Sequence, residues 1–192
     1  MNYGQVVLAI LYTAFIYGCG PKEDPVAELN KNGVSISTDG MNYSAAQGDL
    51  RNLKLLLATG LDPSIASQNG TTALHNAAWS GKKEVVELLL ENKANINATD
   101  SEGVTPLLAA TVQGHSAIVK MLLTKQANID SATNEGSTAL MEAVWKDDEE
   151  MVKILLAAGA DVNKQKKDGT SVLDLVKARG KPSIIALFKP KI

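Results

Sequence analysis

GTTALHNAAWSG, at residues 70–81, is the stretch that decides the fold, because the chain repeats its pattern three more times. GVTPLLAATVQG follows at residues 103–114, GSTALMEAVWKD at 136–147 and GTSVLDLVKARG at 169–180, so successive copies begin at equal intervals. Self-similarity at such a fixed period indicates supersecondary units that stack on one another and share a continuous core. We therefore expect one cooperative array rather than several independent domains.

Each copy carries the local signals of two short helices. The opening glycine suits a turn with positive φ, and aliphatic triplets at 88–90, 121–123 and 154–156 indicate a second helix. Pro106 falls at the first position of a helix, where its missing N–H costs nothing. A hydroxyl that can cap the first helix stands at Thr72, Thr105, Thr138 and Ser171. Helices this short are unstable alone, so stability must come from stacking.

The complete pattern resembles the ankyrin repeat, through the motif at residues 72–75, the glycines at its borders and the sequence Ala-Asn-Ile-Asn at 94–97. The resemblance runs from about residue 39 to the C-terminus. It implies an all-α solenoid of stacked helix-turn-helix units with β-hairpin loops. We expect five repeats, the outer two partly as caps, at about 39–66, 67–99, 100–132, 133–165 and 166–192. Asp24 and Pro25 predict a short helix ending near Gly33, a partial N-terminal cap within a tether at 19–38.

The N-terminal segment has the features of a targeting sequence. Residues 6–16 form a mostly apolar run. The run has the length of a signal-peptide core and is too short to span a membrane. Residues 16–19, Ile-Tyr-Gly-Cys, resemble the bacterial lipobox, which implies a signal peptide at 1–18 and lipidation of Cys19. The mature protein would then be anchored by lipid to an extracytoplasmic membrane face. The alternatives are a cleaved signal without lipid, giving a soluble periplasmic protein, an uncleaved anchor, and a cytosolic protein.

Composition and motifs argue against several functions. The chain has 19 Lys and Arg against 21 Asp and Glu, a net charge of −2, so nucleic acid is not an expected partner. Cys19 is the single cysteine and allows no internal disulfide. His75 and His115 occupy ordinary positions of the repeat, where a local hydrogen-bonding role is expected. We therefore expect no metal, no cofactor and no enzymatic activity.

Two tryptophans give the best indication of a binding surface. Trp79 and Trp145 occupy the same position two repeats apart, with Val112 midway between them. The ankyrin resemblance places this position in the concave groove, where exposed aromatic side chains would anchor a protein or peptide. The alternative is that both rings pack on adjacent helices. The predicted rim consists of Ser80, Gln113, Lys146, Gln68, Asn69, Glu102, Val104, Glu135 and Ser137.

The remaining signals concern charge. The acidic run at 147–150 begins a helix, where carboxylates interact favourably with the positive helix end; a cation site or a basic partner is the alternative. Lys164, Lys166 and Lys167 are expected to offset this charge or to steer an acidic partner. The favoured hypothesis is a monomeric, membrane-tethered scaffold that binds or regulates a partner protein. The second hypothesis is a soluble inhibitor or assembly factor of one enzyme.

Overall fold

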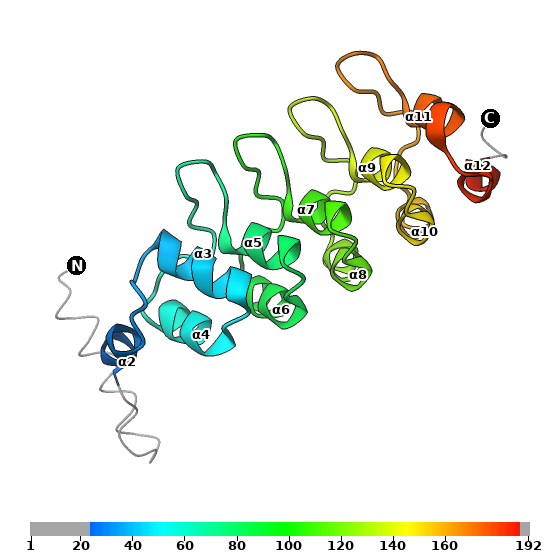
Figure 1. The fold of residues 1–192 in the computed structure, drawn as a ribbon. Helices are drawn as coiled ribbons and strands as arrows, with labels where there is room; N and C mark the ends of the chain where they lie inside the picture. The colour runs from blue at the N-terminus through cyan, green and yellow to red at the C-terminus, as the bar shows by residue number, and fades with distance from the viewer. Residues whose placement is uncertain (1–23, 189–192) are drawn as a thin grey trace.

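The computed structural model describes residues 24–188, which form an all-α solenoid in which helices alternate with long loops (Figure 1). The predicted signal peptide and Cys19 lie outside these residues. An inner row of helices consists of α3 (Thr38–Gln47), α5 (Ala73–Trp79), α7 (Pro106–Val112), α9 (Ala139–Trp145) and α11 (Val172–Arg179). An outer row consists of α4 (Leu50–Ala58), α6 (Lys83–Glu91), α8 (Ser116–Thr124), α10 (Glu149–Ala157) and α12 (Pro182–Phe188). The predicted fold class is confirmed.

The inner row packs more closely than the outer row. Each inner helix contacts the next one along the array, and small buried side chains such as Ala77, Ala110 and Ala143 let their backbones approach. The outer helices carry the larger buried side chains, among them Leu89, Leu122 and Leu155. The inner helices also bury large side chains, such as Leu74, Leu107 and Leu140, so both rows contribute to a single core that runs the length of the array.

The first helix of each repeat begins where the sequence predicts. Thr105 Oγ1 accepts a hydrogen bond from Leu108 N at 3.3 Å, and Ser171 Oγ accepts one from Asp174 N at 3.2 Å. Pro106 is the first residue of α7. Each hydroxyl satisfies an amide that the helix itself cannot pair.

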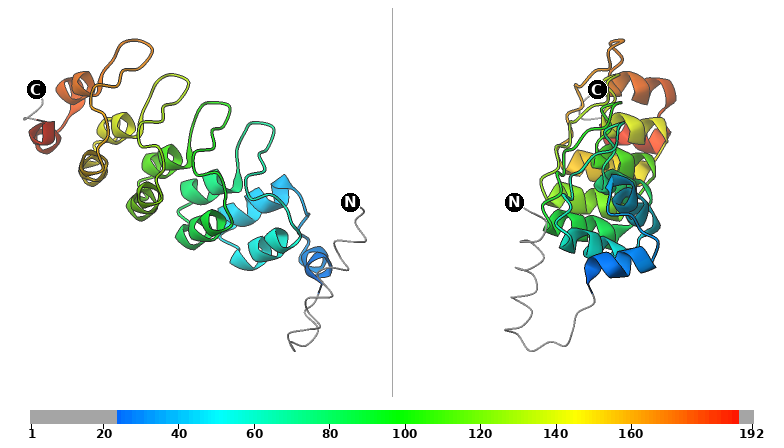
Figure 2. Two further views of the ribbon diagram at one scale, coloured as in Figure 1. Left: turned by 180° about the vertical axis from the view of Figure 1, so that it is seen from behind. Right: turned by 90° about the vertical axis from the view of Figure 1, so that its left-hand side faces the viewer.

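Successive hairpins project from the same side of the array (Figures 1 and 2). Their antiparallel pairing is limited to isolated bridges, such as Ala66 with Thr72 and Ala132 with Thr138, and Gly103 takes a φ of 78° at one tip. Backbone hydrogen bonds join each hairpin to the next, from Ser101 N to Asn69 O at 2.8 Å and from Asn134 N to Glu102 O at 2.8 Å. The hairpins are therefore held in register with one another.

A short helix, α2 (Pro25–Lys31), covers the N-terminal end of the array and packs against α4. Asp24 Oδ1 accepts from Val26 N at 3.1 Å, Pro25 opens the helix, and Gly33 has a φ of 68° beyond its end. Leu29 is fully buried, and Asn32 donates to Asn52 Oδ1 at 2.9 Å. The predicted N-terminal cap helix is confirmed.

Candidate protein-binding surface

The tryptophan row, defined as Trp79, Val112 and Trp145, occupies the last residues of α5, α7 and α9. Trp79 is 51% exposed and Trp145 is 49% exposed, whereas Val112 is half-buried. The predicted exposure of both rings is confirmed, and packing on neighbouring helices covers only about half of each. Two large aromatic side chains held half in water at repeating positions are the kind of feature that marks an interaction site.

Trp145 lies between two cationic side chains of the following repeat. The guanidinium carbon of Arg179, at the end of α11, is 3.7 Å from the ring centroid, and Lys166 Nζ, from the hairpin before α11, is 6.0 Å from it. Both distances suit cation–π attraction. Trp145 therefore faces the angle between the inner helices and the hairpins, a surface that we call the inner face.

Hydrogen bonds from the next repeat fix the C-terminal ends of α5 and α7. The carbonyl oxygen of Trp79 is 2.9 Å from His115 Nε2, and Lys146 Nζ donates to the carbonyl oxygen of Val112. These carbonyls belong to the last turn of their helices, which has no partner within the helix. The positions of the row are thus determined by contacts between repeats.

His75 is a structural residue at the junction of two repeats. Its Nδ1 accepts from Thr72 N at 3.2 Å, so Nε2 carries the proton and donates to the carbonyl of Val104 at 3.0 Å. Burial of the ring lowers the pKa of His75 and keeps it neutral. The predicted local hydrogen-bonding roles of His75 and His115 are confirmed.

The predicted rim residues divide into three groups. Gln68, Asn69, Glu102 and Glu135 are exposed near the hairpin tips, and Gln113 and Lys146 are exposed at the ends of α7 and α9. Ser80 and Val104 are half-buried, and the carbonyl oxygen of Val104 already accepts a hydrogen bond from His75 Nε2. The prediction for Ser137 is wrong, because this residue is only 6% exposed and its N–H donates to Thr133 Oγ1 at 3.2 Å inside the hairpin.

Two exposed residues of this surface were missed by the sequence analysis. Tyr43 on α3 is 66% exposed. It lies one helical turn before Ala46, which occupies in the first repeat the position that Trp79 has in the second. Residues one turn apart on a helix share a face, so this relation to Trp79 was a usable signal. Arg179 occupies the position of Lys146 in the following repeat, which was the signal for its contact with the row.

The carboxylates of the acidic run have local partners. Asp148 caps α10 by accepting from Met151 N at 3.0 Å, Glu149 pairs with Lys153 at 2.5 Å, and Glu150 pairs with Lys120 at 3.3 Å. Asp147 lies 3.9 Å from Lys181. The lysines at 164, 166 and 167 form no ion pair with the run, whose partners are Lys120, Lys153 and Lys181, so their offset of its charge stays a prediction. They lie on the hairpin after α10, whereas the run spans the start of that helix.

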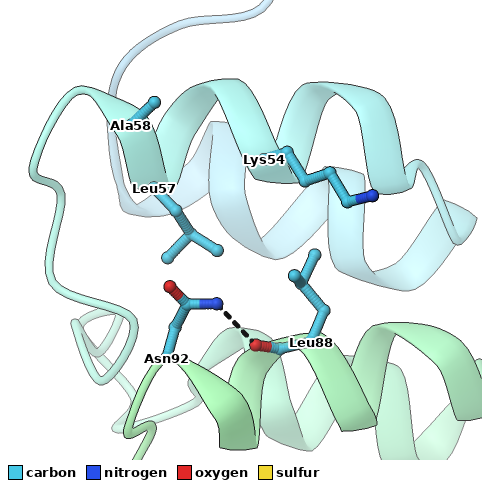
Figure 3. A pocket seen from close by; sticks show the side chains of 5 residues that line it. All are labelled: Lys54, Leu57, Ala58, Leu88 and Asn92. Carbon is cyan, nitrogen blue, oxygen red and sulfur yellow. Dashed lines mark hydrogen bonds between the residues drawn. The ribbon is translucent and has the colours of Figure 1, made fainter. Parts of the chain in front are cut away.

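Other features of residues 24–188 do not compete with this surface. No group of three or more His, Cys, Asp or Glu in this range is placed to hold a metal ion, and no helix in it is long and apolar enough to cross a membrane. An open hollow of about 270 Å³ lies between α4 and α6, lined by Lys54, Leu57, Ala58, Leu88 and Asn92 (Figure 3). It belongs to the outer helices and is too open to enclose a ligand.

Stacked helix pairs, a shared core and aligned hairpins define a helical repeat protein. The sequence matches the family described as Ankyrin repeats (3 copies), over residues 23–100, 41–132 and 93–166. The chain belongs to the ankyrin repeat family. Proteins of this family are generally non-catalytic modules that bind other proteins. No curated protein shows a significant match to the chain.

Proposed function

We propose that this chain is a monomeric, non-catalytic scaffold that binds or regulates one partner protein through its inner face. The observation that carries the proposal is the half-exposure of Trp79 and Trp145 at the same position of two repeats. Tryptophan is among the residues that contribute most to binding at protein interfaces. His115 of the next repeat contacts the carbonyl of Trp79, and Arg179 of the next repeat stacks on the ring of Trp145, so little conformational freedom is lost on binding.

An affinity pull-down from the native organism tests this proposal. Wild-type protein is compared with the Trp79→Ala/Trp145→Ala variant, and circular dichroism verifies that both are folded. The matched control is Val26→Ala/Ile36→Ala, which removes two other exposed apolar side chains, each 40% exposed, near the N-terminal end. We expect the partner to be lost with the tryptophan variant and retained with the control. Retention by both variants would contradict the proposed site.

We also propose that Cys19 is lipidated and tethers the array to an extracytoplasmic bacterial membrane. The support is the sequence at 16–19 and the apolar run before it. Two or three acyl chains, at about 0.8 kcal/mol per buried methylene, would anchor the protein stably. The intact mass of the mature protein, with labelled palmitate incorporation into wild type and Cys19→Ala, tests the tether. A mature protein without lipid would favour a soluble inhibitor or assembly factor.

A further inference from the structure

Particular positions of the inner face become cationic towards the C-terminal end of the array. The residue that ends or directly follows each inner helix is Gln47, Ser80 and Gln113 in the first three repeats, but Lys146 and Arg179 in the last two. At two hairpin positions, Thr133 and Asn134 are followed one repeat later by Lys166 and Lys167. Because the same positions carry neutral residues, or the acidic Asp100, elsewhere in the array, the fold itself does not require a cation there.

Two of these cations contact the ring of Trp145, and a third follows it in the sequence. Arg179 stacks on the ring at 3.7 Å, and Lys166 Nζ lies 6.0 Å from its centroid. Lys146 is the next residue along the chain, and its Nζ donates to the carbonyl of Val112. The half-exposed ring is therefore shared by two positive side chains, from α11 and a hairpin, and a third, Lys146, lies between the ends of α7 and α9.

No carboxylate of residues 24–188 forms an ion pair with these three cations. The ion pairs of this range are Arg51–Glu28, Lys120–Glu150, Lys153–Glu149 and Lys181–Asp147. The acidic residues closest in the repeat pattern are Glu142, one turn before Trp145 on α9, and Glu135 and Asp168 on the hairpins. Asp168 accepts from Thr170 N at 2.9 Å. The hydrogen bond from Thr170 and, after it, the nearby charge of Lys166 lower the pKa of the Asp168 carboxyl. No carboxylate in this range forms a direct ion pair with Arg179, Lys166 or Lys146, so their donors can take a carboxylate of a ligand.

We infer that this C-terminal part of the inner face docks an acidic segment of the partner protein. Carboxylates of that segment bind Arg179, Lys166 and Lys146, and an apolar side chain packs on Trp145 and Val112. A guanidinium presents paired donors that match a carboxylate, which favours this chemistry. The patch is small on a chain of net charge −2, and the acidic run at 147–150 lies close by, so an extended polyanion fits poorly. The inference rests on the proposed function.

Selection of random peptides on the full chain tests the inference. We expect the enriched peptides to combine several Asp or Glu residues with one or two apolar residues, and to bind more weakly as salt rises. One enriched peptide is then titrated against Lys146→Gln/Lys166→Gln/Arg179→Gln, which should weaken its binding by about tenfold. The control is Lys54→Gln/Lys83→Gln/Lys125→Gln, which removes the same charge at the outer helices and should change binding by less than about twofold.

The outcomes separate this inference from the proposed function. Neutral or basic peptides whose binding still depends on Trp145 would overturn the inference and leave the proposed function standing. Equal weakening by both charge variants would also overturn it, because net charge alone would then explain binding. Tighter binding of oligodeoxythymidylate than of any acidic peptide would assign the patch to a different ligand. Peptides that bind without dependence on either tryptophan would overturn both proposals.

Discussion

At the residue scale, Asp147 occupies a backbone position that other repeats fill with glycine. Its φ is 55°, and Gly81 and Gly114 take 71° and 75° at the same position. Its Oδ1 is buried without a partner, and its contact with Lys181 at 3.9 Å is weak. We expect Asp147→Gly to raise the free energy of unfolding by about 1 kcal/mol, because left-handed backbone is costly for residues with a Cβ. Urea denaturation measures the change.

Two alanine substitutions separate backbone strain from steric contact at this position. An added Cβ at Gly114 comes no closer than 3.8 Å to Asp148 Oδ2, so Gly114→Ala should cost about 1 kcal/mol from backbone strain alone. An added Cβ at Gly81 lies 2.7 Å from His115 Cε1, so Gly81→Ala should cost clearly more. Equal stability of the two variants in urea would show that the contact with His115 does not matter.

The neutral state of His75 makes the stability of the array depend on pH. Burial lowers its pKa in the folded protein, so the unfolded chain binds a proton first as the pH falls. The free energy of unfolding should be unaffected by His75 above its ordinary pKa of about 6.5 and should decline below it. Urea titrations across this range should show a steeper decline for wild type than for His75→Gln. Parallel curves for the two proteins would contradict the assignment.

The outcomes for individual residues show what a repeating sequence can predict. Caps such as Thr105 and the exposure of Trp79 were predictable, because each depends on a position within one repeat. The stacking of Arg179 on Trp145 joins two successive repeats and depends on the side-chain geometry between them. Ser137 was misjudged because it is buried next to Thr138, whereas its counterpart Val104 is only half-buried, a difference that the spacing alone does not resolve. The sequence thus predicted the fold and the exposure of the two tryptophans, but not the cations that contact Trp145.

At the scale of single elements, the outer helices differ in how they begin. Asp49 caps α4 through Asn52 N at 3.0 Å and Asp148 caps α10, whereas α6 begins after Lys82 without a side-chain cap. Lys82→Asp should therefore stabilise the protein by about 1 kcal/mol, since it supplies a cap and a negative charge at the helix start. Thermal and urea unfolding measure the gain. Lys82→Ala is the control, and a similar gain from it would show that loss of the lysine is sufficient.

At the scale of the whole molecule, the repeats are joined by more than helix packing. The hairpins are linked by backbone hydrogen bonds, the last from Lys167 N to Glu135 O at 3.0 Å. The loops after the outer helices are linked as well, because Asn128 N donates to Asn97 Oδ1 and Asp161 N donates to Asp130 Oδ1. Each repeat is thus tied to the next at the core, the hairpin and the loop. This supports the prediction of one cooperative body.

Leu122 tests that cooperativity, because it is fully buried on α8 in the central repeat. Leu122→Ala should cost about 2–5 kcal/mol and lower amide protection in the flanking repeats as well as in its own. Leu29→Ala removes an equally buried leucine side chain from the terminal helix α2. This change should lower amide protection mainly in α2 and in its neighbour α4. Native-state hydrogen exchange compares the two variants. If Leu122→Ala reduced protection only in α7 and α8, each repeat would be an independent folding unit.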